Sequence, residues 1–227
     1  MRHLYLAFLL AFAILVIGFW PTTIGGAAGA LDWLRIVHGI LATLWMAMLV
    51  AQSWLAGRWR LKWHRRIGWT SVAIVPALVI SALLVVADML RHSTYFPRDL
   101  RLSLAWADIL SLILFSLLWG MAIRHRKSWP LHARYVGCTV FAALPPALGR
   151  VYGAIPGIGG LTGALPPSYI TVELVLLALI VLDFVRGGAP RPYAIALAGT
   201  AAIHMTLFSA PHWPLFVRFA EAIGPIG

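Results

Sequence analysis

Residues 68–90 read GWTSVAIVPALVISALLVVADML, and Asp88 is the one charged side chain in this run. A helix needs about 20 predominantly apolar residues to cross a bilayer, so this stretch is predicted to span a membrane. Similar apolar runs recur along the chain, and glycine, proline or basic residues separate them. The predicted spans lie near residues 4–20, 36–56, 68–90, 102–123, 132–150, 168–186 and 193–210.

The overall composition points to the same class of protein. Hydrophobic residues make up 61% of the 227 positions and charged residues 11%, with a mean hydropathy of +0.87. A soluble protein of this length does not bury so much apolar surface in its core. We therefore predict an all-α fold: one integral membrane domain over residues 1–227, a bundle of seven transmembrane helices in contact with the lipid bilayer.

The basic residues predict an orientation for this bundle. If the N-terminus lies inside, the inner side carries 12 basic residues and one acidic residue, and the outer side carries six of each. The positive-inside rule then favours an inner N-terminus and an outer C-terminus. The net charge of +11 is explained by contact with lipid headgroups, so no nucleic-acid partner is expected. The predicted location is the bacterial cytoplasmic (inner) membrane.

Two histidines lie in similar basic runs near the inner ends of predicted spans. The run Trp-His-Arg-Arg holds His64, Arg65 and Arg66, and the run His-Ala-Arg holds His132 and Arg134. A histidine beside arginines at the mouth of a membrane helix is suited to ligate haem iron while the arginines neutralise the propionates. We predict that His64 and His132 face each other at the inner side. The plain alternative for His64 is a solvated residue of a basic loop.

A second polar group is predicted in the outer half of the bundle. His38 lies near the outer end of the second span and His204 lies in the outer half of the seventh, so their depths match. Arg150, at the outer end of the fifth span, is expected to face the interior beside Asp108 or Glu173, because unpaired charges are costly in hydrocarbon. The plain alternatives are a structural ion pair for Arg150 and hydrogen-bonded core residues for the histidines.

Several polar landmarks follow one another in a recognisable order through residues 36–152. They are His38, Gln52, His64-Arg65-Arg66-Ile67-Gly68, His132-Ala133-Arg134 and Arg150. This order resembles a family of uncharacterised bacterial predicted membrane proteins over about half of the chain. The family pattern prefers a basic residue where this chain has Ala133, and Trp-Met where it has Tyr135-Val136.

The histidines on the helices are also similar to those of two-haem b-type membrane cytochromes, a group that includes ferric reductase-like proteins. This similarity implies haem b as cofactor and electron transfer with a quinol or another membrane redox protein as partner. The implied cofactor residues are His64, His132, His38, His204, Arg65, Arg66, Arg134 and Arg150. Two other functions stay open: a non-enzymatic subunit or scaffold of a larger complex, and a small-anion transporter or binding protein with Arg150 at its site.

Overall fold

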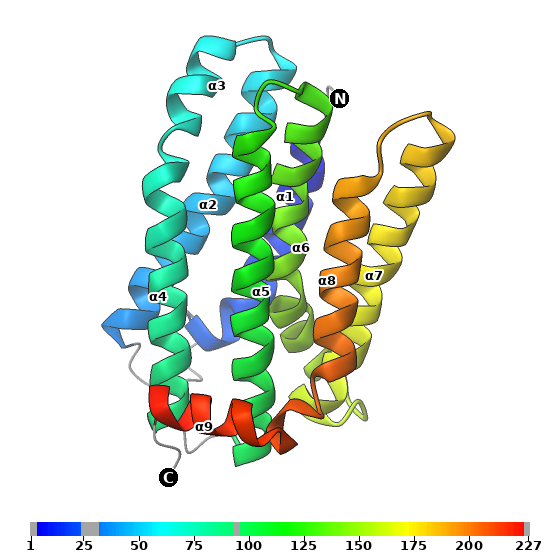
Figure 1. Cartoon of the computed structure of the whole chain (residues 1–227). Helices are drawn as coiled ribbons and strands as arrows, with labels where there is room; N and C mark the ends of the chain where they lie inside the picture. Colours follow the sequence, from blue (N-terminus) through cyan, green and yellow to red (C-terminus); the bar gives the residue numbers. More distant parts are fainter. Residues whose placement is uncertain (1–3, 24–31, 93–95, 225–227) are drawn as a thin grey trace.

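The structure, a computed structural model, describes residues 4–23, 32–92 and 96–224, and in these ranges every regular element is a helix (Figure 1). The elements are α1 (Leu4–Thr23), α2 (Trp33–Gly57), α3 (Leu61–Gly68), α4 (Ser71–His92), α5 (Arg98–Arg124), α6 (Trp129–Gly153), α7 (Gly160–Val185), α8 (Arg191–Thr206), the 3₁₀ turn η1 (Ala210–His212) and α9 (Pro214–Ile223). The predicted all-α class is therefore confirmed.

Five stretches of the described chain are long and apolar enough to cross a membrane. They are Leu4–Pro21, Trp33–Gly57, Leu61–His92, Arg98–Arg124 and Gly160–Val185. Many of their large apolar side chains point outward from the bundle, including Leu10, Ile80 and Leu174. Such an apolar outer surface is consistent with an integral membrane protein.

Two regions of the chain differ from the predicted organisation. The run at 68–90 is preceded by the separate short helix α3, so His64 lies on α3 and not on the long helix α4. The last predicted span, 193–210, ends early because α8 stops at Thr206. Pro211 and Pro214 follow it, and proline both lacks an N–H donor and disfavours a helical residue before it. The chain instead turns into η1 and α9, which cross the end of the bundle (Figure 1).

Helix α6 lies at the centre of the bundle and packs against α1, α5, α7 and α8. Small residues permit these close contacts, as is common between membrane helices. Gly18 of α1 is the clearest case, because a Cβ there would lie 2.5 Å from the carbonyl oxygen of Ala147 on α6. This approach holds α1 along α6, so the first turns of α1 form a wall beside the start of α6.

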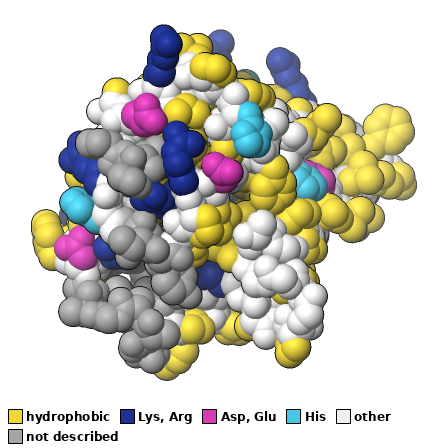
Figure 2. Space-filling view, turned by 90° about the horizontal axis from the view of Figure 1, so that it is seen from below, with side chains coloured by type: hydrophobic (Ala, Val, Ile, Leu, Met, Phe, Trp, Pro, Cys, Tyr) yellow, Lys and Arg dark blue, Asp and Glu magenta, His cyan; other side chains and the backbone are white. Residues whose placement is uncertain are grey.

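The two ends of the bundle differ in charge. One end is formed by α3 and by the connections α2–α3, α5–α6 and α7–α8, which lie together in Figure 1, and we call it the basic end. Its described basic residues include Arg58, Arg60, Lys62, Arg65, Arg66, Arg124, Arg126, Lys127, Arg134, Arg186 and Arg191. At the opposite end Figure 2 shows acidic, basic and hydrophobic side chains together. Arg98 and Glu221 form an ion pair of 3.2 Å there that ties α9 to α5.

Candidate functional site

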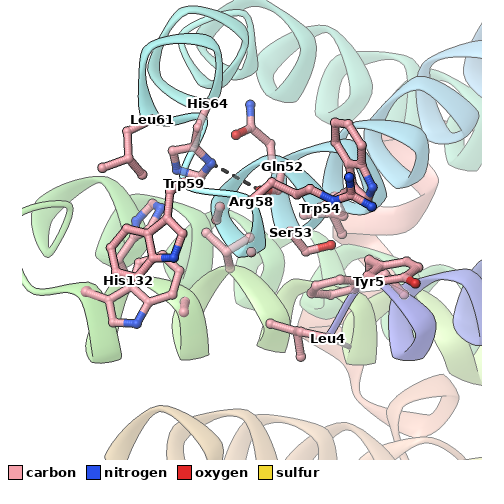
Figure 3. Close-up of a pocket in the computed structure, with 17 residues that line it drawn as sticks. Leu4, Tyr5, Gln52, Ser53, Trp54, Arg58, Trp59, Leu61, His64 and His132 are labelled. Atoms are coloured by element: carbon pink, nitrogen blue, oxygen red, sulfur yellow. Dashed lines mark hydrogen bonds between the residues drawn. The ribbon is translucent and has the colours of Figure 1, made fainter. Parts of the chain in front are cut away.

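A pocket of about 1080 Å³ opens at the basic end between α1, α2, α3 and α6 (Figure 3). Its walls are mainly apolar and aromatic, and its polar side chains include Gln52, Arg58, His64 and His132. Small-molecule and cofactor sites typically measure about 300–1,000 Å³ and combine apolar walls with a few placed polar groups. We call this space the histidine pocket.

The structure brings together the two histidines that the basic runs single out. His64 comes from α3 and His132 from the first turn of α6, and both line the histidine pocket. Their ring centroids lie 6.2 Å apart and the ring planes meet at 83°. The short helix α3 makes this possible, because it carries His64 across the end of the bundle.

Both rings are held through the same nitrogen. His64 Nδ1 donates to the carbonyl oxygen of Gln52 at 3.2 Å, and His132 Nδ1 donates to the carbonyl oxygen of Ala122 at 2.9 Å. A carbonyl oxygen only accepts, so each Nδ1 carries the proton and each neutral ring keeps its lone pair on Nε2. A histidine that binds a metal commonly has its other ring N–H oriented in this way. In its neutral form, each ring is therefore held with Nε2 free to ligate a metal.

The spacing of the two rings fits one metal between them. Metal–imidazole bonds of about 2 Å on opposite sides of an ion place the two ring centroids roughly 6 Å apart once the half-width of each ring is added. The observed 6.2 Å agrees with this value. Two imidazoles also match the two axial positions of haem iron, whose remaining four ligands belong to the macrocycle. The distance between the two rings therefore matches that of a bis-histidine haem.

Among the described residues, Arg58 is the cation that lines the histidine pocket. It follows the last turn of α2, and its guanidinium carbon lies 5.0 Å from the centre of the Trp54 ring. Arginine on an aromatic face keeps its charge and its donors free to meet an anion. Arg58 is not among the predicted cofactor residues, because it does not stand beside a histidine in the sequence.

The three arginines predicted beside His64 and His132 lie on other surfaces. Residues on a helix are about 100° apart, so an arginine one or two positions after a histidine points elsewhere. Arg65 bonds the Leu61 carbonyl of its own helix, and Arg66 lies over the Trp63 ring.

Arg134 points from α6 toward α7. Its Nη2 donates to Asp183 Oδ1 at 2.5 Å, and both side chains are largely buried. Arg134 follows His132 by two positions, which directs it to the opposite face of α6. The pair therefore joins two helices at the basic end, apart from the histidine pocket.

The two histidines predicted to pair in the outer half are held by different helices. His38 Nδ1 lies 3.1 Å from Ser81 Oγ on α4, and this hydroxyl donates to the Leu78 carbonyl, so the histidine is the donor. His204 Nδ1 lies 2.9 Å from Glu173 Oε1 on α7, and its ring stacks on Tyr169. Both histidines thus have partners that sequence periodicity did not identify.

Arg150 faces the interior, but Glu173 is not its partner. Its Nη1 donates to the Pro146 carbonyl of the same helix at 2.8 Å, and its guanidinium carbon lies 4.2 Å from the centre of the Phe19 ring. Asp108 interacts with it electrostatically. Of the two acidic residues predicted as alternative partners of Arg150, Asp108 is therefore the one that interacts with it.

Comparison of the chain with protein-family models, with curated proteins and with solved structures found no match. The function is therefore argued from the geometry of the site. In the described part of the chain, the arrangement of His64 and His132 in their pocket gives the clearest indication of a functional site.

Proposed function

We propose that the chain is a b-type haem membrane protein that transfers electrons, and that His64 and His132 would hold the haem iron. The observation that supports this proposal is the pair of imidazoles 6.2 Å apart, each fixed through Nδ1 to a backbone carbonyl, on the wall of a pocket of about 1080 Å³. When bound between two imidazoles, haem supplies a one-electron redox couple.

Other residues of the pocket provide what such a cofactor needs. Phe8, Leu49 and Val136 form apolar walls that exclude water from a macrocycle. Arg58 at the pocket is placed to balance a propionate, in the role that the sequence assigned to Arg65, Arg66 and Arg134. The carbonyl of Gln52 keeps the His64 ring in its ligating tautomer.

We further infer that α1, α2, α4, α5, α6, α7 and α8 all cross the membrane, with the basic end inside. The concentration of arginine and lysine at that end supports this orientation. The opposite end carries most of the acidic residues, including Asp88 paired with Arg35 and Glu221 paired with Arg98. The proposed haem then lies near the cytoplasmic face of a bacterial inner membrane, where a quinol or another membrane redox protein is the expected partner.

Thiol labelling of intact cells tests this orientation. Lys62→Cys at the basic end is expected to resist a membrane-impermeant maleimide, and Ala222→Cys on α9 is expected to react, since both positions are exposed. The native Cys138 is buried and should give no background. Efficient labelling of the Lys62→Cys variant before cell lysis would show that the basic end faces outward.

The visible spectrum of the purified protein, expressed with a haem precursor or mixed with iron protoporphyrin IX, tests the function. We expect a Soret band and, on reduction, the sharp bands of a six-coordinate low-spin b-type haem at a stoichiometry near one. A protein that binds no haem under both conditions contradicts the proposal. The scaffold and small-anion functions would then take its place.

A further inference from the structure

The turn that ends α2 uses a backbone conformation that normally belongs to glycine. The Trp59 N–H donates to the Ala56 carbonyl at 3.1 Å, and the Arg60 N–H donates to the Leu55 carbonyl at 2.9 Å. These two bonds form a Schellman motif, in which the residue after the helix cap adopts the left-handed conformation. Trp59 holds that position with φ of +59°, as the one non-glycine residue with a positive φ in the described chain.

Helix α7, which ends at the same end of the bundle, has a glycine at the equivalent position of its terminal turn. After α7 the Gly187 N–H donates to the Phe184 carbonyl at 2.9 Å, and the Gly188 N–H donates to the Asp183 carbonyl at 2.8 Å. Gly187 has φ of +67°. The same motif therefore carries glycine where only the turn matters, which is the expected choice because a Cβ disfavours this conformation. A bulky tryptophan at the equivalent position is unfavourable for the turn, which indicates that its side chain has a function.

The Trp59 side chain belongs to the histidine pocket. It is 83% exposed, so few protein contacts hold it. Figure 3 shows it projecting into the same space as His64 and His132, and all three line the pocket. Residues with strained backbone gather at ligand clamps, where the surrounding structure maintains the strain.

We propose that Trp59 is a ligand-binding residue that stacks its indole on the flat conjugated ring of the ligand held by His64 and His132. This inference rests on the proposed haem function and names the residue that covers the bound ring. The unfavourable turn aims the indole at the pocket, and ligand binding buries a surface that is otherwise exposed. Stacking on a flat ring then slows the release of the ligand.

Neighbouring tryptophans show what a purely interfacial role looks like. Trp63 and Trp69 are 50% and 63% exposed at the same end, and neither lines the histidine pocket. Trp63 lies within α3, and Trp69 has an ordinary φ of −65°. Tryptophan anchors a bilayer interface from such unstrained positions, so anchoring alone does not account for the turn at Trp59.

The test uses the full chain in lipid nanodiscs, with iron protoporphyrin IX as the probe. The variants are Trp59→Gly, Trp59→Phe and, as an interfacial control, Trp63→Phe. Trp59→Gly is expected to raise the thermal midpoint of the haem-free protein by relieving the turn, and to speed haem transfer to an apo-globin acceptor about tenfold or more by removing the stacked ring. Trp59→Phe keeps a ring and should stay within about threefold of the parent rate. Trp63→Phe should change neither quantity.

The possible results separate the stacking role, the backbone strain and the haem function from one another. If the parent protein binds haem and Trp59→Gly releases it at the parent rate, the stacking role is overturned while the haem function stands. If Trp59→Gly lowers the midpoint of the haem-free protein, the indole supports the fold and the argument from strain fails. If the parent protein binds no haem, the proposed function and this role fall together.

Discussion

His64→Ala and His132→Ala are each expected to abolish the low-spin haem spectrum of the purified protein. Each variant removes one of the two proposed iron ligands, and a single remaining imidazole would not give a six-coordinate haem. Loss of groups that merely orient a ligand typically costs about 10–100-fold in metal affinity. Loss of the ligand itself should therefore weaken haem binding by more than about 100-fold. Titration with iron protoporphyrin IX, followed in the visible spectrum, measures this change.

His125→Ala is the matched control for these two variants. His125 lies at the same end of the bundle and stacks on Tyr135, but it does not line the histidine pocket. Its replacement should leave the spectrum unchanged. External imidazole is expected to restore part of the low-spin signal in His64→Ala, because the pocket has room beside the lost ring. Loss of the signal in one of the two ligand variants but not in the other would break the proposed pairing.

Arg134→Ala should lower the free energy of unfolding by about 3–5 kcal/mol, because it leaves the Asp183 carboxylate buried without its partner. The side chains of Arg134 and Asp183 are only 17% and 13% exposed. Asp183→Asn should have an effect of the same sign. A paired Arg134→Met and Asp183→Leu replacement should recover much of the loss, since apolar substitutes for both charges carry no desolvation cost. Thermal and denaturant unfolding in detergent micelles provides the measurement.

The pair Arg98–Glu221 serves as the exposed counterpart. Its side chains are 46% and 47% exposed at the opposite end of the bundle. Exposed ion pairs contribute about 0–1 kcal/mol, so Arg98→Ala should change stability little. Equal losses in Arg98→Ala and Arg134→Ala would mean that burial does not set the strength of the Arg134–Asp183 pair.

The all-α class and most of the apolar helices follow from the sequence because they depend on local properties. A run such as 102–123 is long and apolar enough to be recognised without knowledge of its neighbours, and the structure has α5 there. The depth of His64 and His132 is equally local, since it depends on their place beside basic connections. The short helix α3 is less visible, because its basic sequence reads as a connection between two apolar runs.

The partners of the polar residues are a tertiary property. Spacing along α6 places Arg134 and His132 on different faces, but it does not show that Asp183 of α7 lies opposite one face and His64 of α3 opposite the other. The inclusion of Arg58 in the histidine pocket likewise depends on how α3 folds back after α2.

The sequence by itself thus determined a bundle of helices apolar enough to cross a membrane, with one basic end and two histidines at that end. The meeting of these two rings was also predicted, and the structure adds their spacing. Only the tertiary structure decided that Arg134 and Asp183 join α6 to α7, and that Glu173 pairs with His204. The physical reason lies in the composition of the helices. A helix such as α7 has apolar residues on every side and only a few polar ones, so its sequence does not show which side faces the bundle. Close packing against several neighbouring helices decides which partners its polar residues meet.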